Sequence, residues 1–396
     1  MSRMRMLLLL CGALAAGEYL ASFVPECAEL WSVTAGLAVF LALFGYGLGI
    51  RGWRYLFFAV LGFALYLQAS VADEQLFREK PWMRGREWMM RRDSSPESGG
   101  VCEVKKDLSR RIGLGLEGER MTVTLSRAIL LGERRRLPPQ VKRMFVDSGT
   151  MHVFAISGLH VGAIAEVLAV LLAFLLVPRR FVGLAALPIL WGYVCLIGAP
   201  PSAVRAAAMA TFSGLAPLFW RKPDGLRSWA LTFLLVHLLS PRMIVNVGNI
   251  LSFAVMLAIV LVGRYVRDWV KWKQALTITF AAWAVGVPIS ARVFGRVTPG
   301  GMLANLVLIG VARVMVVAGS VGVLLSYLSE KLAVHLNNLS ALFVRLMVLT
   351  ADAVTRLPGS NFETGQWTMW SCILWYVALA ALATVFVRWS KARQSL

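Results

Sequence analysis

The feature that most constrains this chain is a series of long, continuously apolar segments running from its first residues to its last. A helix needs roughly 20 apolar residues to cross a bilayer, and only helices or closed barrels satisfy their backbone there. Because these runs do not alternate between polar and apolar residues, they predict helices. The sequence therefore predicts an all-α polytopic membrane protein with about 11–12 transmembrane helices. The candidate spans are 6–24, 30–50, 55–71, 152–177, 181–198, 203–220, 227–240, 244–264, 274–292, 302–327, 333–357 and 368–388.

Charge patterning predicts the orientation of these spans. The net charge is +20, which indicates either cytoplasmic loops rich in Lys and Arg or an anionic partner such as nucleic acid. The basic short loops fall on one side of the predicted bilayer, so both termini are expected in the cytoplasm. Two spans fit less well: 227–240 is short enough to be re-entrant, and 333–357 carries charges that also suit an interfacial helix. The basic short loops are 51–54, 179–180, 221–227, 264–273 and 388–393.

The N-terminus has two readings. Arg3 and Arg5 precede an apolar run within 1–28, a pattern that also fits a cleaved signal peptide. Two more apolar runs follow at once, so an uncleaved first span is preferred.

The one long polar segment, 73–150, separates two groups of spans. It is basic and includes Arg134, Arg135 and Arg136. On the orientation above it is external, and long loops largely escape the positive-inside rule. Its first half has few apolar positions and is expected to be poorly ordered. Pro138-Pro139 followed by 141–157 predicts an amphipathic helix on the external surface. Three parts follow: N-terminal transmembrane helices (1–72), the external basic segment (73–150) and a transmembrane channel domain (151–396).

Cysteine and histidine patterns give no support to a metal or disulfide framework. The five cysteines are scattered, with no CxxC pair, and the four histidines lie apart from one another and from cysteine. No GxxxxGK[ST] motif is present, so P-loop hydrolysis of ATP is not expected. We predict no metal, no cofactor and no enzymatic activity. The residues are Cys11, Cys27, Cys102, Cys195 and Cys372, and His152, His160, His237 and His335.

Four predicted spans begin with unusual polar and small residues at the end predicted to be external. Each set alone has a plain explanation in helix caps, turn glycines and snorkelling arginine. Four sets at one depth favour a water-filled vestibule that faces outward. The polar members are His152, Ser157 and His160, then Arg205, then Asn249 and Ser252, then Asn305; Gly158, Gly162 and Gly248 are expected to pack helices, the first two as a GxxxG face.

These stretches resemble the ComEC/Rec2 family of competence proteins. HVFAISGLHVG (152–162) is similar to the family's HLLAISGLHVG, and LLGE (130–133) to its LLGD. PPSAVRAA (200–207), NVGNILSF (246–253) and TPGGMLANL (298–306) resemble its PSxxRA, DxGFxLSF and SPxGLLANL motifs, in the same order. Two positions depart from it, because Asn246 stands where the family tends to have Asp and Asn249 where it tends to have Phe.

The resemblance implies a channel for single-stranded DNA across the bacterial inner membrane during natural transformation. It also implies further partners: a separate nuclease, a DNA receptor and a cytoplasmic helicase or single-stranded-DNA-binding protein. Many members carry a metallo-β-lactamase-like domain, and full-length members often carry an OB-like domain. The sequence lacks the HxHxDH pattern of the first, and 73–150 is too short for a whole copy of the second. The alternative is a proton-coupled transporter of a small anion on the same scaffold, and a third reading is a scaffold without transport.

Two charged residues lie deep in predicted spans. Glu166 and Arg313 should both sit near the membrane midplane at about 1.5 Å rise per residue. Charges at that depth usually pair or line a path, so a structural ion pair and an aqueous path are the two alternatives. Arg205 is predicted nearer the external mouth, where its guanidinium could meet a phosphate together with helix N-termini. Ser157 and His160 would line the next turn inward.

Overall fold

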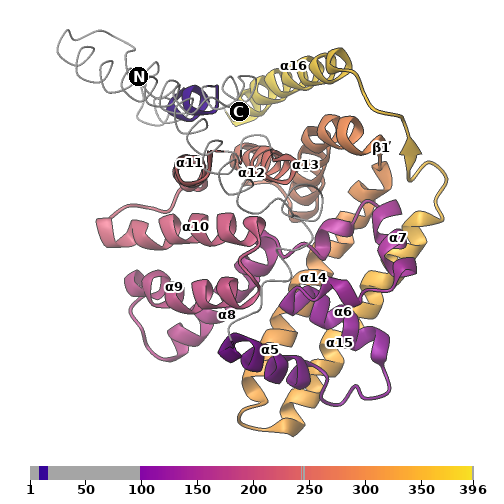
Figure 1. Ribbon diagram of the computed structural model, residues 1–396. Coiled ribbons are helices and arrows are strands. Elements are labelled where there is room, and N and C mark those ends of the chain that lie inside the picture. Colours follow the sequence, from indigo (N-terminus) through magenta and orange to yellow (C-terminus); the bar gives the residue numbers. More distant parts are fainter. Residues whose placement is uncertain (1–8, 17–98, 242, 244–245, 395–396) are drawn as a thin grey trace, which may run out of the picture. The chain divides into compact units, whose positions relative to one another are not determined.

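The computed structural model describes residues 9–16 and 99–394, apart from 242, 244 and 245. The described chain is almost entirely helical (Figure 1). By its internal contacts it divides into two compact units. The first contains residues 1–97 and 223–253, and the second contains 98–222 and 254–396. The predicted boundary at 72/73 and the predicted spans 30–50 and 55–71 lie outside the described residues.

Helices in the second unit follow one another with short connections. They are α5 (Gly99–Ile112), α6 (Arg120–Leu131), α7 (Pro139–Asp147), α8 (Gly158–Phe174), α9 (Arg179–Leu196), α10 (Pro201–Leu215), the greater part of α12 (Val247–Tyr265), α13 (Lys271–Phe294), α14 (Pro299–Leu325), α15 (Glu330–Thr355) and α16 (Met369–Gln394). Short 3₁₀ turns η3 (Arg134–Arg136), η4 (Met151–Val153) and η5 (Ala216–Phe219) join some of them, and β1 (Arg296–Val297) pairs antiparallel with β2 (Phe362–Glu363).

The first unit is described over fewer residues. It contains a short helical segment at 9–16, α11 (Gly225–Leu239) and the start of α12. Asp224 caps α11, because its carboxylate accepts hydrogen bonds from the backbone N–H groups of Leu226 and Arg227 at 2.9 and 3.0 Å.

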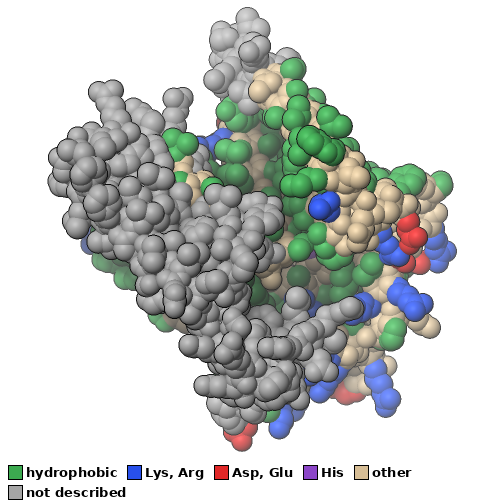
Figure 2. Space-filling model, turned by 45° about the horizontal axis from the view of Figure 1, so that its top comes forward, with side chains coloured by type: hydrophobic (Ala, Val, Ile, Leu, Met, Phe, Trp, Pro, Cys, Tyr) green, Lys and Arg blue, Asp and Glu red, His purple; other side chains and the backbone are tan. Residues whose placement is uncertain are grey.

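The predicted all-α membrane architecture is confirmed. Among the described residues, six helices are long and apolar enough to cross a membrane: α9, α12, α13, α14, α15 and residues 369–386 of α16. Helices α8 and α11 are apolar but shorter. Hydrophobic side chains cover a broad part of the described surface, and Lys and Arg gather toward one margin of that view (Figure 2). Exposed apolar side chains of this extent are typical of lipid-facing helices.

Close backbone approach fixes the packing of α9 against α10. A Cβ on Gly183 would lie 2.7 Å from the Cα of Gly214, which no side chain tolerates. Trp191 of α9 also donates from Nε1 to the hydroxyl of Thr211 on α10 at 3.1 Å. Glycine at both positions therefore lets the two helices touch along their backbones.

The longest hairpin is formed by α14 and α15. Its register follows from Gly319, where a Cβ would lie 3.3 Å from Ser340 Oγ, and from Gly322, where it would lie 2.9 Å from Asn337 Oδ1. Near the opposite end, a Cβ on Gly300 would meet the side chain of Val354 at 2.8 Å. The two helices are thus antiparallel along nearly their whole length.

The segment 99–150 differs from its prediction. Residues 99–112 form helix α5, where poor order was expected, and α6 is deeply buried, with Leu125, Ile129 and Leu130 in the main core. The amphipathic helix expected over 141–157 ends at Asp147, because Gly149 takes a left-handed conformation with φ +71°. The physical reason for the buried α6 is that α14 and α15 cover its apolar face. In the sequence, Arg127 and the Thr and Ser residues between the apolar positions conceal that face.

Segment 99–149 also reaches both ends of α14. At the C-terminal end, Arg111 donates from Nη1 to the carbonyl of Ser326 at 3.2 Å. At the N-terminal end, the Cα of Gly149 lies 3.4 Å from where a Cβ on Gly301 would stand. A segment that touches both ends of one helix spans the length of that helix.

Candidate functional site: the polar helix ends

Helix α8 begins with a local hydrogen-bonded cap. Ser157 is its N-cap residue, and the backbone N–H of Ser157 donates to Nδ1 of His160 at 3.3 Å. The Ser157 hydroxyl lies 3.4 Å from the same nitrogen. Since Nδ1 accepts from the backbone, the proton of the neutral ring is on Nε2. The sequence motif around Ser157 and His160 therefore has a first role in starting α8.

His160 is fully buried, and its second nitrogen is not used by this cap. Its exposed fraction is 0%, and Nε2 has no hydrogen-bond partner among the described residues. A buried donor without a partner is unusual in a native protein. His152, by contrast, is exposed in the 3₁₀ turn η4. The two histidines predicted at one mouth thus differ in environment.

Helix α10 begins beside the start of α8. Pro201 occupies its first turn, and Ser202 donates from its hydroxyl to the carbonyl of Ile156 at 2.6 Å. One turn later, Arg205 is buried, with 6% of its surface exposed. The prediction placed Arg205 at an open mouth; in the structure its guanidinium is instead enclosed.

Helix α14 begins against the segment that precedes α8. Thr298 is its N-cap residue, and Pro299 fills the first position. A Cβ on Gly301 would lie 3.3 Å from the carbonyl oxygens of both Ser148 and Gly149, so the glycine permits close backbone contact. Asn305, two turns into α14, is half-buried, and its Oδ1 is buried without a partner among the described residues.

The starts of α8, α10 and α14 are therefore grouped around residues 148–157. Ser202 bonds to Ile156 at one side of this segment, and Gly301 packs on Gly149 at the other. Each helix N-terminus carries partial positive charge from its unpaired N–H groups. Three such ends in one place favour anions, with Arg205 adding a full charge.

The start of α12 belongs to the first unit and has its own polar cluster. Asn246 caps the helix, since its Oδ1 accepts from the backbone N–H of Asn249 at 3.0 Å. The Asn249 amide Nδ2 lies 2.9 Å from the Met243 carbonyl and 3.2 Å from Nε2 of His237. Nδ1 of His237 lies 2.8 Å from the Phe233 carbonyl. These contacts fit a neutral histidine with its proton on Nδ1.

His237 is the residue of this cluster for which the sequence predicted no role. It is fully buried, and its ring centroid lies 4.0 Å from that of Phe233 and 5.6 Å from that of Phe253. Its spacing of four from Phe233 in an apolar helix is the signal that predicts a satisfied core histidine. Ser252, predicted to line the path, is half-buried on α12.

The charges predicted at mid-depth form an ion pair, one of the two alternatives that the sequence left open. Arg313 Nη2 lies 2.6 Å from both carboxylate oxygens of Glu166, and Nε lies 3.1 Å from Oε2. The side chains are 55% and 49% exposed. The pair joins α8 to α14 and yet remains open on one side.

The predicted packing glycines have unequal surroundings. A Cβ on Gly158 would stand 3.5 Å from Met256 and 3.8 Å from Ala206, which is ordinary contact. On Gly162 it would meet nothing within 4 Å among the described residues, so that glycine is not part of a tight GxxxG contact there. On Gly248 it would lie 3.4 Å from Asn246 Oδ1. The tight glycine contact at α10 is instead the one with α9, between Gly183 and Gly214.

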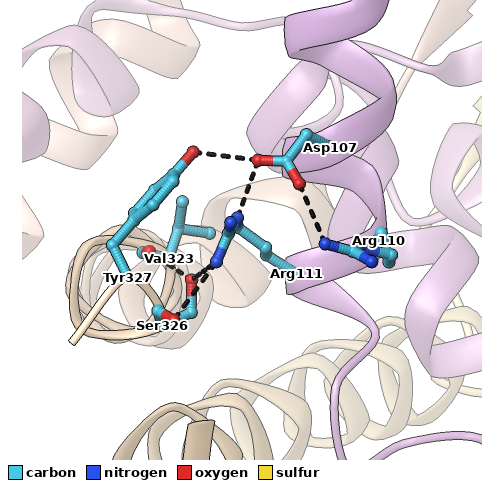
Figure 3. A network of polar contacts seen from close by, with 6 residues as sticks. All are labelled: Asp107, Arg110, Arg111, Val323, Ser326 and Tyr327. Atoms are coloured by element: carbon cyan, nitrogen blue, oxygen red, sulfur yellow. Dashed lines mark hydrogen bonds and ion pairs between the residues drawn. The ribbon is translucent and has the colours of Figure 1, made fainter. Parts of the chain in front are cut away.

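A polar cluster that the sequence did not predict anchors α5 to the end of α14. Arg111 donates from Nε to Asp107 at 2.7 Å, and its guanidinium lies 3.7 Å from the centre of the Tyr327 ring (Figure 3). The Tyr327 hydroxyl donates to the same carboxylate at 3.0 Å. The bond from Arg111 lowers the pKa of Asp107. The cluster also holds Ser326, whose hydroxyl is 3.1 Å from Arg111.

Over the described ranges, no three His, Cys, Asp or Glu side chains are grouped closely enough to hold a metal ion.

Most of this chain matches the model of a known protein family. The model of the Competence protein family matches residues 129–389. The chain belongs to the Competence protein family. The ComEC/Rec2 resemblance of the motifs is thereby confirmed, and the chain is a membrane protein with a competence-related role. All four polar helix starts lie within the matched range, whereas α5 and most of α6 precede it.

Individual relatives cover parts of the chain. An uncharacterised protein of Aquifex aeolicus (strain VF5) is 31% identical over 209 residues, 52% of this chain and 46% of that protein. ComE operon protein 3 of Bacillus subtilis (strain 168) is 28% identical over 204 residues, 51% of this chain and 26% of its own length. The uncharacterised protein YcaI of Escherichia coli (strain K12) is 30% identical over 151 residues, 36% and 19%. The alignments span less than half the length of each relative, and no solved structure matches the chain.

Proposed function

We propose that this member of the Competence protein family forms a channel for single-stranded DNA across the bacterial inner membrane, with both termini in the cytoplasm. The observation that carries the proposal is the grouping of three helix N-termini, from α8, α10 and α14, around residues 148–157, with Arg205 one turn away. A polyanion crossing a low-dielectric slab needs its charge offset at the start of the path. Fixed helix ends supply that charge without strong binding, which would stall the strand.

The enclosed position of Arg205 changes what it can do. A buried guanidinium contributes its charge through the low-dielectric protein around it, and it need not touch each phosphate directly. Bidentate contact with a phosphate would follow if the helix ends open when DNA arrives. Either way, reversal of this charge opposes the passage of an anion.

Transformation with free DNA tests the proposal. A strain lacking the gene should lose uptake, and the wild-type gene should restore it. Arg205→Lys should restore part of the uptake, since the charge remains without the planar fork, whereas Arg205→Glu should restore none at equal protein level. Arg120→Glu, a charge reversal at an exposed residue of the same unit, is the matched control and should restore full uptake. Normal transformation by well-expressed Arg205→Glu would refute the role of these helix ends.

We further propose that this chain does not degrade DNA. Degradation of the second strand would then belong to a separate nuclease, and delivery and removal of the imported strand to a DNA receptor and a cytoplasmic helicase or single-stranded-DNA-binding protein. Purified protein with Mg²⁺, Mn²⁺ or Zn²⁺ should leave labelled DNA intact. Cleavage that survives purification and is lost on changing His152 or His160 would contradict this expectation.

A second function is favoured by the half-exposed pair of Glu166 and Arg313. A carboxylate within a spanning segment is a typical element of proton-coupled transport. A proton-coupled transporter of a small anion would show uptake driven by a pH gradient in proteoliposomes, with no dependence on DNA. That result, together with normal transformation of the deletion strain, would favour the transporter.

A further inference from the structure

The Glu166–Arg313 pair lies near the middle of α14, which is long and apolar enough to cross a membrane, and of α8, a shorter apolar helix bonded to it through this pair. Glu166 is the central residue of the 17-residue α8, about 12 Å from either end at 1.5 Å rise per residue. Arg313 lies about 21 Å from the start and about 18 Å from the end of α14, by the same rise. The apolar core of a bilayer is about 30 Å thick, so both groups are far from either headgroup layer.

About half of each side chain at this depth is open. The exposed fractions are 49% for Glu166 and 55% for Arg313. Charged groups exposed to hydrocarbon are strongly unfavourable, so intramembrane charges face protein or water. The open side of this pair therefore meets either a water-filled path or another protein surface.

The helix positions one turn before the pair are open rather than packed. Gly162 lies one turn before Glu166, and Gly310 lies one turn before Arg313; both are exposed. A Cβ on either glycine would meet nothing within 4 Å among the described residues. One turn before the pair, each helix thus has a position with no side chain and open space beside it.

Glu166 bonds to only part of the Arg313 guanidinium. Nε and Nη2 bond to the carboxylate, whereas Nη1 has no partner among the described residues. A guanidinium has two edges suited to an oxyanion. One edge of Arg313 is held by Glu166, and the other is free to meet a phosphate.

We propose that Glu166 and Arg313 form a phosphate-exchange station on a water-filled path that runs along α8 and α14. A passing phosphate bonds to Arg313 on its free edge and competes with the Glu166 carboxylate. The return of Glu166 to Arg313 then releases the phosphate. The pairing keeps the resting path close to neutral, which prevents tight binding of a polyanion. Lipid phosphates cannot be the ligand, because the station lies about 12 Å or more from the ends of either helix. The identity of the phosphate as the DNA backbone rests on the proposed function, whereas the water-filled path does not.

Thiol labelling tests the water-filled path independently of DNA. In a chain with its five native cysteines replaced, Gly310→Cys places a thiol one turn before Arg313, where a Cβ meets no neighbour among the described residues. Leu382→Cys on α16 is the matched control, since Leu382 is 54% exposed near the middle of that helix. A membrane-impermeant, negatively charged thiosulfonate should modify Gly310→Cys roughly tenfold faster or more, because the reactive thiolate forms only in water. Equal rates at the two positions would overturn the proposal in favour of a lipid or protein contact.

Protection by DNA tests the phosphate station. A short single-stranded oligonucleotide should slow modification of Gly310→Cys, and sodium chloride at the same ionic strength should not. Labelling without protection would overturn phosphate exchange at this position.

Paired substitution separates function from folding. Glu166→Gln with Arg313→Gln leaves no unpaired charge, so we expect normal protein level with reduced transformation. Unchanged transformation by this double variant would show that the pair is only structural. Failure of the proposed function would look different, since the deletion strain would then transform normally while Gly310→Cys still reacted from water.

Discussion

The path of residues 99–149 along α14 predicts that the two ends of this segment lie on opposite sides of the membrane. Arg111 contacts Ser326 at one end of α14, and Gly149 packs on Gly301 at the other. The 25 residue steps between Gly301 and Ser326 correspond to about 38 Å at 1.5 Å rise per residue. This length exceeds the roughly 30 Å of hydrocarbon in a bilayer. If α14 crosses the membrane, as its length and composition indicate, segment 99–149 must cross with it.

Cysteine labelling from each side checks this prediction. Arg110→Cys marks the α5 end, since the Arg110 side chain is 74% exposed. Arg143→Cys marks the other end, because Arg143 is exposed and lies one turn before Asp147, which pairs with Arg296 at 3.2 Å. An impermeant reagent added outside intact cells should modify Arg143→Cys, and Arg110→Cys only after the membrane is opened.

Modification of both cysteines from outside would refute the reasoning and restore the wholly external segment that the loop charges predict. The expected result has a consequence for the N-terminus. With residue 99 on the cytoplasmic side, a cytoplasmic N-terminus requires an even number of crossings before residue 99, whereas the hydropathy pattern predicts three. Those spans lie almost wholly outside the described residues, so the labelling result decides between the two counts.

Two further predictions concern stability. Gly183→Ala should lower the free energy of unfolding by about 1–3 kcal/mol, because the new Cβ would lie 2.7 Å from the backbone of Gly214. Thermal unfolding in detergent measures this loss. Gly192→Ala on the same helix is the control and should have no such effect, because a Cβ there meets nothing within 4 Å. Acidification should loosen α5, because Arg111 lowers the pKa of Asp107 in the folded state, so the carboxylate stabilises the fold at neutral pH and this contribution is lost as the pH falls through that lowered pKa. Protease cleavage at Arg110 should therefore increase at low pH in the wild type, and Asp107→Asn should be cleaved readily at all pH values.

Apolar length explains why most helices could be predicted from the sequence. The predicted spans 181–198 and 274–292 correspond to α9 and α13 within a few residues at each end, since a run of about 20 apolar residues has few other stable states. Helix α6 was missed because Arg127 and the Thr and Ser residues before it interrupt its apolar positions. Arg127 in fact folds back and donates to the Ser109 carbonyl at 2.9 Å. Leu125 and Ile129, four apart, were the remaining signal.

The residues of the candidate site could be predicted from the sequence, but their contacts with one another could be predicted less well. The ion pair between Glu166 and Arg313 could be predicted as one alternative from their similar depth in the membrane, because unpaired charges at that depth are unfavourable. The bond between Asn249 and His237 could not be predicted, since it depends on how α11 meets the start of α12 in space. The enclosure of Arg205 depends likewise on its neighbours, and proximity to a helix N-terminus alone suggested an open position.

The departure of Asn246 from the family's Asp leads to a last prediction. Asn246 caps α12 through a bond from the Asn249 backbone to its Oδ1 at 3.0 Å. Asp and Asn are both strong N-cap residues, and a negative charge at a helix N-terminus is favourable. Asn246→Asp should therefore keep the protein level and any transformation activity, whereas Asn246→Ala should lower stability by about 1 kcal/mol.

The comparison of the two variants separates capping from a role on a path for anions. If Asn246 only caps the helix, the order of function should follow the order of stability, with Asp equal to or above Asn and Ala below both. If its neutral amide matters to a passing phosphate, the Asp variant should unfold at the same temperature as the wild type yet transform poorly, because a carboxylate repels an anion. The deciding measurement is transformation per unit of folded protein. A stable Asn246→Asp variant that transforms less well than the wild type would contradict the view that Asn246 only caps the helix.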